Sequence, residues 1–211
     1  MITKEQLTEK LKLYVILDRK LGNGVSLPDQ AHLAIAGGAT AIQLRDKEMT
    51  SRDYYEMALT IGEICKENNV LFIVNDRLDI ALAAEADGVH LGQEDLPLQA
   101  AKKLVPPSFI IGISATNVEE AKEAENGGAD YLGVGDVFGT GSKADAKTIG
   151  VDMLRQICAA TSIPCVAIGG VNKENVHIAL DSGAIGIAVI SAVVSQKDIT
   201  KAAKELRAII P

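Results

Sequence analysis

Eight short apolar runs, separated by stretches of helical period, are the feature of this 211-residue chain that most limits its fold. Continuous apolar strands that alternate with helices are typical of a parallel sheet buried on both faces, and eight such units favour a closed barrel. We therefore predict an α/β fold, a single-domain (β/α)8 TIM barrel over residues 1–211, with an open doubly wound sheet as the alternative. The predicted strands are 12–17, 40–44, 70–74, 87–91, 109–113, 131–135, 164–168 and 185–190.

Two local patterns add detail to this barrel. A Gly-Ala step precedes several predicted strands, at 37–39, 127–129 and 182–184, and glycine there can end a helix in the left-handed conformation. Residues 3–11 predict a short extra N-terminal helix, with Thr3 as its cap ahead of Gln6.

The composition excludes several classes of protein. Apolar residues make up 47% of the chain and charged residues 23%, as in a globular protein with a sizeable core. No run approaches the roughly 18 apolar residues that span a bilayer, and the N-terminus lacks a signal-peptide pattern, so we expect a cytoplasmic protein without a membrane partner. The net charge of −7 argues against a nucleic-acid partner. The three cysteines lack metal-ligand spacing and are expected to be reduced packing residues.

Charged motifs follow four of the predicted strands. They are Gln-Leu-Arg-Asp-Lys at 43–47, Asn-Asp-Arg at 75–77, His-Leu-Gly-Gln-Glu-Asp at 90–95 and Gly-Thr-Gly-Ser-Lys at 139–143. Catalytic groups of a TIM barrel come from the C-terminal ends of its strands and the loops after them, so we expect these motifs to meet at one face.

The residue types in these motifs predict a site for a polyanion and a metal. Arg45, Lys47 and Lys143 offer cationic donors, and Asp76 and Asp95 offer the carboxylate oxygens that Mg²⁺ prefers. Two alternatives stay open. The carboxylates could act as a general acid/base pair, although the three cations would then lack an anionic partner. The Asn-Asp-Arg triplet could also be a solvated turn.

Three further strand ends carry polar or glycine residues, at 112–114, 169–170 and 190–191. Glycine lets backbone N–H groups approach a phosphate, although an isolated Gly-Gly is more often a tight turn. The loop at 140–143 is interpreted as a lid and lacks the spacing of a P-loop. His90 is either a satisfied interior histidine or part of a substrate wall, and no arrangement for covalent catalysis is present.

Taken together, the motifs at 43–47, 74–77, 86–95, 112–114, 140–143 and 167–170 resemble those of the thiamine phosphate synthase family, from about residue 12 to the C-terminus. The resemblance implies a TIM-barrel transferase. The implied reaction moves the 4-amino-2-methylpyrimidin-5-ylmethyl group from its diphosphate to a thiazole phosphate, carboxylated or not, and releases pyrophosphate. A homodimer stays open beside a monomer.

The resemblance also implies roles for individual residues. Asp76 and Asp95 would hold one Mg²⁺ on the pyrophosphate. The residues implied for the pyrimidine diphosphate are Gln43, Leu44, Arg45, Asp46, Lys47, Asn75, His90, Ser114 and Lys143. The residues implied for the thiazole phosphate are Thr140, Gly141, Ser142, Gly170, Ile190 and Ser191. The residues expected to be catalytic are Ser114, Lys143, Arg45 and Lys47.

The chain departs from the family pattern at two places, and rival functions stay open. Gly-Asp stands at 135–136 where Gly-Pro is more common, and Gly-Ser stands at 141–142 within a lid that more often has Thr-x-Thr-Lys. A related thiazole tautomerase would need no metal pair and would have a histidine near Thr116. A different phosphate-binding barrel, such as an aldolase or epimerase, would leave the carboxylate pair and the Lys143 lid unexplained. A barrel that senses thiamine precursors without turnover would have a damaged metal or lid motif, and neither motif is damaged in this sequence.

Overall fold

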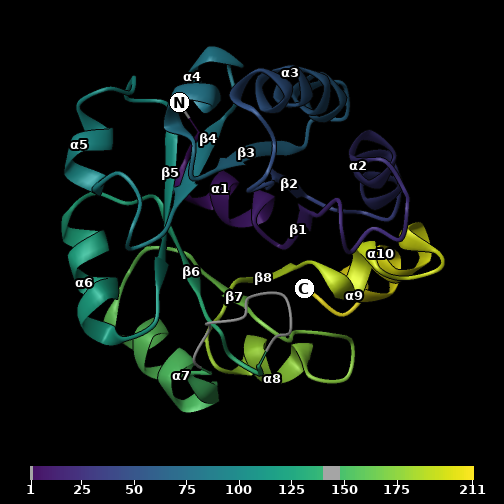
Figure 1. The fold of residues 1–211 in the computed structure, drawn as a ribbon. Helices are drawn as coiled ribbons and strands as arrows, with labels where there is room; N and C mark the ends of the chain where they lie inside the picture. Colours follow the sequence, from purple (N-terminus) through teal and green to yellow (C-terminus); the bar gives the residue numbers. More distant parts are fainter. Residues whose placement is uncertain (1, 140–147) are drawn as a thin grey trace.

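The computed structural model describes residues 2–139 and 148–211, and across these residues eight parallel strands form one closed barrel (Figure 1). The strands pair in chain order, and β8 pairs back to β1, with Leu13 opposite Ile187. The predicted (β/α)8 barrel is therefore confirmed and the open sheet is wrong. The strands are β1 Leu13–Leu17, β2 Ala41–Leu44, β3 Leu71–Asn75, β4 Gly88–Leu91, β5 Ile110–Ala115, β6 Tyr131–Val134, β7 Cys165–Ile168 and β8 Gly186–Val189.

Helices surround the barrel, as Figure 1 shows. Within the described ranges they are α2 Leu27–Ala36, α3 Ser51–Glu67, α4 Leu78–Ala83, α5 Leu98–Lys102, α6 Val118–Asn126, α7 Gly150–Ala160, α8 Val176–Asp181, α9 Ser191–Val194 and α10 Ile199–Arg207. Gly38, Gly128 and Gly183 have φ angles of 98°, 84° and 100°, so the predicted left-handed helix ends are confirmed. No helix in the described parts of the chain has the length and apolar character needed to cross a membrane.

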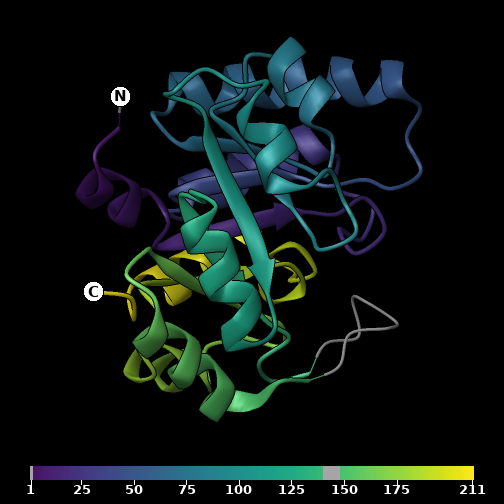
Figure 2. The same ribbon diagram turned by 90° about the vertical axis from the view of Figure 1, so that its left-hand side faces the viewer.

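The extra N-terminal helix is confirmed and closes one end of the barrel. It is α1, Lys4–Lys10, and Thr3 and Gln6 form a reciprocal capping box at its start. Leu7 and Leu11 are buried with Tyr14, Ile73 and other inward side chains in the apolar cluster inside the barrel. Figure 2 shows α1 at the end where the strands begin.

A second, larger apolar cluster fills the layer between the strands and the helices. It includes Val15, Ile42, Val89, Leu132 and Ile187. The strands are buried on both faces because alternate side chains enter the two clusters. Cys65, Cys158 and Cys165 are free thiols; Cys65 and Cys165 are buried and Cys158 is half-buried, as expected for packing residues.

Side chains just before β2, β4 and β6 accept hydrogen bonds from N–H groups at the start of the preceding strand. The Leu13 N–H donates to Thr40 Oγ1 at 2.9 Å, the Phe72 N–H to Asp87 Oδ2 at 2.8 Å, and the Ile111 N–H to Asp130 Oδ2 at 2.8 Å. These bonds satisfy donors at the end of the barrel that α1 covers.

Candidate active site

A cavity of about 1420 Å³ lies at the other end of the barrel, where the strands end. Its lining includes residues that directly follow strands, among them Arg45, Asp76, Gly92, Thr116 and Gly169. Sites for small ligands usually have volumes of about 300–1,000 Å³, so this cavity is large enough for two substrates side by side.

Most of the residues predicted for the site meet in this cavity. Those that line it are Gln43, Arg45, Lys47, Asn75, Asp76, His90, Asp95, Ser114, Gly170, Ile190 and Ser191. The predicted residues Thr140, Gly141, Ser142 and Lys143 lie outside the described residues. Leu44 and Asp46 do not line the cavity, since Leu44 is fully buried in the outer apolar cluster.

Asp46 holds the loop after β2. Its Oδ1 accepts the N–H groups of Glu48 and Met49, both at 2.8 Å, and its Oδ2 lies 3.0 Å from Arg19 Nε. These partners occupy both carboxylate oxygens, and the side chain is 6% exposed. The structure therefore gives Asp46 a local role in shaping the loop that carries Lys47.

Asp76 and Asp95 face one another across the ends of β3 and β4. The pKa of Asp76 is raised to about 6, first by burial and then by the negative charge and hydrogen bonding of Asp95, while the charges of Lys47 and Arg45 act to lower it. Asp76 has a φ of 62°, a conformation that aspartate tolerates better than most residues, and its N–H donates to the His90 carbonyl at 2.9 Å. Asp95 Oδ2 accepts the Gly92 N–H at 2.6 Å.

This donor set fits a magnesium ion held partly by substrate. The described residues contain no group of three or more acidic, histidine or cysteine side chains that could enclose a metal. Mg²⁺ is commonly bound by one or two carboxylates, with water and substrate phosphates as its other ligands. A cation between Asp76 and Asp95 would also remove the repulsion that raises the pKa of Asp76.

Two neighbouring groups position the cationic side of the site. Arg45 Nη1 lies 3.7 Å from Asp18 Oδ2, and both side chains are 15% exposed. Asp18 was not predicted from the sequence, although it directly follows β1 just as the charged motifs follow other strands. The Tyr54 hydroxyl of α3 lies 2.8 Å from the Leu44 carbonyl oxygen and 3.2 Å from that of Asn75, and so links the ends of β2 and β3.

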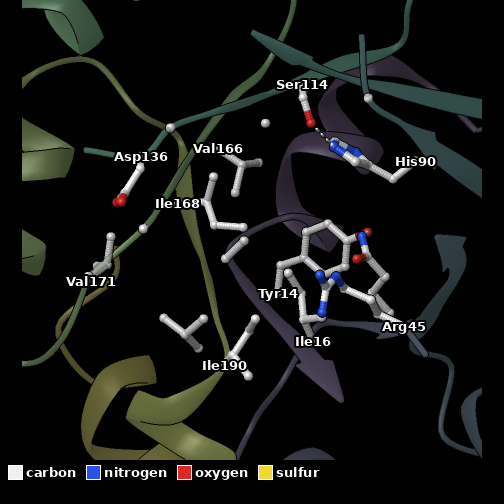
Figure 3. Close-up of a pocket in the computed structure, with 18 of the residues that line it drawn as sticks. Tyr14, Ile16, Arg45, His90, Ser114, Asp136, Val166, Ile168, Val171 and Ile190 are labelled. Atoms are coloured by element: carbon white, nitrogen blue, oxygen red, sulfur yellow. Dashed lines mark hydrogen bonds between the residues drawn. The ribbon is translucent and has the colours of Figure 1, made fainter. Parts of the chain in front are cut away.

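Polar side chains also form a connected series inside the barrel. Gln43 Nε2 donates to the Tyr14 hydroxyl at 2.7 Å, and the hydroxyls of Tyr14 and Tyr131 lie 3.1 Å apart. His90 Nδ1 lies 3.1 Å from the Tyr131 hydroxyl, and its Nε2 lies 3.0 Å from Ser114 Oγ (Figure 3). Sequence reasoning missed both tyrosines because it treated their strands as continuous apolar runs. Both lie near the start of their strands, at positions whose side chains point into the barrel.

The cavity has an apolar side opposite these polar groups. Figure 3 shows Val166, Ile168, Val171 and Ile190 lying across the cavity from His90 and Ser114. Val166 and Ile168 come from β7, and Val171 and Ile190 come from the segments that follow β7 and β8. One side of the cavity therefore suits charged groups and the other an apolar ring.

The segment 136–139, which follows β6, packs directly against Gly169 and Gly170. A Cβ atom at Gly169 would lie 1.9 Å from Asp136 Oδ1, and one at Gly170 would lie 2.3 Å from the Gly139 carbonyl oxygen. Both glycines have positive φ angles, of 97° and 65°. Close approach by residues 136–139 therefore explains the need for glycine, while Gly170 also lines the cavity.

Comparison with known proteins agrees with this geometry. A family model described as thiamine monophosphate synthase matches residues 13–193. The chain is 80% identical over 211 residues to a thiamine-phosphate synthase of Coprothermobacter proteolyticus, with both chains covered completely. It is 54% identical over 199 residues to one of Methanocella arvoryzae, covering 94% of each chain.

A solved structure is similar along nearly the whole chain. It is the thiamine phosphate pyrophosphorylase of Pyrococcus furiosus, which is 50% identical with a TM-score of 0.91 and with 97% of each chain covered. A 3-hexulose-6-phosphate synthase, 20% identical with a TM-score of 0.71, shows likeness of fold alone. The match of the family model, the high identity of these relatives and the shared barrel show that the chain belongs to the thiamine monophosphate synthase family and is a transferase enzyme.

Proposed function

We propose that the protein transfers the 4-amino-2-methylpyrimidin-5-ylmethyl group from its diphosphate to a thiazole phosphate, in a reaction that depends on Mg²⁺. The observation that carries the proposal is the meeting of Asp76 and Asp95 with Arg45 and Lys47 on one side of a cavity large enough for two substrates. The relatives named as thiamine-phosphate synthases support it.

The diphosphate would bind on the side of the cavity formed by the ends of β2, β3, β4 and β5. Arg45 and Lys47 would neutralise its charge, while Asn75 and Ser114 offer hydrogen-bond donors. Mg²⁺ held by Asp76 and Asp95 would supply further positive charge to the pyrophosphate group. Lys143, for which the family resemblance implies a place on the same diphosphate, stays a prediction.

The thiazole phosphate would bind on the side formed by β7 and β8. Ile168 and Ile190 offer apolar surface for the ring, and Gly170 and Ser191 line the cavity near them. Thr140, Gly141 and Ser142 are expected on its phosphate from the family resemblance.

The reaction would begin when the C–O bond between the methylene carbon and the diphosphate breaks, with its electron pair leaving on pyrophosphate. The electron-rich aminopyrimidine stabilises the resulting cation. The lone pair of the thiazole nitrogen then forms the new C–N bond, and a carboxylated thiazole would also release carbon dioxide and take up a proton. Arg45 and Lys47 would stabilise the leaving group, and the apolar side of the cavity would keep water from the cation. No side-chain nucleophile is needed.

The direct test incubates the purified protein with both substrates and Mg²⁺, and measures thiamine phosphate and pyrophosphate. We expect both products, their loss with EDTA, and a loss of about 10²–10³-fold in kcat for Asp95→Asn. Asp79→Asn is the matched control, because Asp79 is an exposed carboxylate paired with Arg77 outside the cavity lining. Product formation unaffected by EDTA would contradict the metal-binding role.

The same assay separates the rival functions. Isomerisation of the thiazole phosphate without pyrophosphate release would favour a tautomerase, and binding of either substrate without any reaction would favour a sensor. Thr116 lines the cavity where a tautomerase would have a histidine, and its hydroxyl is bonded to Glu120 at 3.0 Å. This threonine favours the synthase, because it cannot transfer a proton near neutral pH as histidine does.

A further inference from the structure

A hydrogen-bonded series of five side chains crosses the interior of the barrel at the floor of the cavity. It runs from Gln43 on β2 through Tyr14 on β1, Tyr131 on β6 and His90 on β4 to Ser114 on β5. Its donor to acceptor distances are 2.7, 3.1, 3.1 and 3.0 Å in that order. The two end residues are predicted substrate ligands, whereas the tyrosines between them have no assigned role.

Two glycines make room for this series. Gly112 pairs with both His90 and Tyr131 in the strand register, and a Cβ atom there would lie 2.1 Å from Tyr131 Cζ. A Cβ atom at Gly133 would lie 2.8 Å from His90 Cε1. The rings of His90 and Tyr131 pack with their centroids 5.5 Å apart. The barrel therefore holds the two rings in fixed positions.

The amide of Gln43 gives the series a direction. Its Nε2 can only donate, so the Tyr14 oxygen accepts and the Tyr14 proton is left for Tyr131. The Tyr131 proton is then left for His90 Nδ1, which lies 3.1 Å from the hydroxyl oxygen. Burial raises the pKa of both tyrosines well above the usual value, so each keeps its proton. A neutral His90 then carries its own proton on Nε2 and donates it to Ser114 Oγ.

We propose that Tyr131 is a positioning residue that fixes His90 as the Nε2–H tautomer and thereby leaves the Ser114 proton free to bind a substrate acceptor in the cavity. Gln43 Oε1 is left as an acceptor at the other end. The benefit to substrate rests on the proposed function: a diphosphate needs donors and an aminopyrimidine needs an acceptor. If every hydrogen bond of the series ran in the opposite direction, Ser114 would present a lone pair to the diphosphate anion. Gln43 would then present its NH₂ group to the amino group of the pyrimidine, and both pairings would be unfavourable.

The tautomer is measured without substrate by two-bond ¹H–¹⁵N NMR of histidine-labelled full-length protein at pH 7.5. His90→Gln identifies the His90 signals among those of His32 and His177. We expect a protonated Nε2 and an unprotonated Nδ1. A protonated Nδ1, whether in the other tautomer or in the imidazolium ion, would overturn the proposal.

Two matched variants test the part played by Tyr131. Tyr131→Phe removes the donor to His90 Nδ1, and we expect the second tautomer to appear and kcat/KM to fall about tenfold, as for loss of one buried hydrogen bond. Tyr14→Phe removes the adjacent buried hydroxyl but leaves Tyr131 able to donate, so the His90 spectrum is expected to stay unchanged. Equal spectral changes in both variants, or no change in Tyr131→Phe, would contradict the positioning role.

A third variant tests whether Ser114, at Nε2 of the ring, sets the tautomer of His90 instead of Tyr131. Ser114→Ala removes the acceptor for Nε2, and the Nε2–H tautomer is expected to persist because Tyr131 still donates to Nδ1. Loss of the Nε2–H tautomer in this variant would assign its control to Ser114 and overturn the proposal. If the NMR result is as expected but the wild type forms no thiamine phosphate, the proposed function fails while the positioning role stands.

Discussion

The two ends of the barrel are built from the same strands, but their polar side chains have different partners: backbone N–H groups at one end and an open cavity at the other. At the end where the strands begin, Thr40, Asp87 and Asp130 accept the N–H groups of neighbouring strands, and the fully buried Leu11 at the end of α1 packs inside the barrel. At the end where the strands finish, charged side chains point into a cavity.

The consequence is clearest in the carboxylates. Asp130 accepts a backbone N–H, whereas Asp76 lies beside another carboxylate and has its pKa raised to about 6. Groups at the first end therefore stabilise the fold, and groups at the second end are held ready for ligands at a cost in stability. Substitutions at the two ends should accordingly separate stability from activity.

The largest expected effect is on catalysis. Asp76→Asn should lower kcat by about 10³-fold, equivalent to about 4 kcal/mol at 1.36 kcal/mol per factor of ten, because it removes one of the two metal-binding carboxylates. Asparagine tolerates the positive φ of this position, so far-ultraviolet circular dichroism should be unchanged. Unchanged turnover in the product assay would place the metal elsewhere.

The second effect is on stability at the closed end. Leu11→Ala should lower the free energy of unfolding by about 3 kcal/mol, since Leu11 is fully buried between α1 and the barrel interior. Its kcat at 25 °C should stay close to that of the wild type. Urea denaturation measures the change, and Leu104→Ala is the control because that leucine is 63% exposed. A loss of kcat as large as the loss of stability would show that the ends are coupled.

The third effect concerns a single backbone donor. Asp130→Ala leaves the Ile111 N–H without its 2.8 Å partner and should cost about 1–2 kcal/mol of unfolding free energy. Asp130→Asn keeps an acceptor oxygen and should cost less. Equal losses in the two variants would mean that the charge of Asp130, for example toward Lys102, matters more than the hydrogen bond.

The smallest effect is a pH-dependent gain in stability at the open end. The pKa of Asp76 is higher in the folded than in the unfolded protein, so ionisation of this carboxyl lowers the free energy of unfolding. This loss of stability develops as pH rises through about 6. Asp76→Asn removes this penalty. Without metal, its Tm should exceed that of the wild type at pH 7.5 and match it at pH 4. Thermal unfolding at both values in EDTA tests this; a difference that is larger at pH 4 would reverse the sign.

Much of the site was predictable because charged residues interrupt the apolar pattern at strand ends. Arg45, Asp76 and Asp95 were found in this way, and all three line the cavity. Asp46 has the same residue type and position, yet its oxygens are used by the loop after β2. A sequence shows which residues are charged but not which partners are near enough to occupy them.

The sequence by itself determined the number and order of the strands, the capped N-terminal helix, the helix ends and the family. These depend on periodicity and on local backbone preference, which neighbouring residues decide. Only the tertiary structure decided that Tyr14, Tyr131 and His90 meet inside the barrel, and that Asp18 pairs with Arg45. The contacts among Tyr14, Tyr131 and His90 join strands far apart in the chain and depend on barrel closure, whereas that of Asp18 with Arg45 depends on the side to which each side chain points.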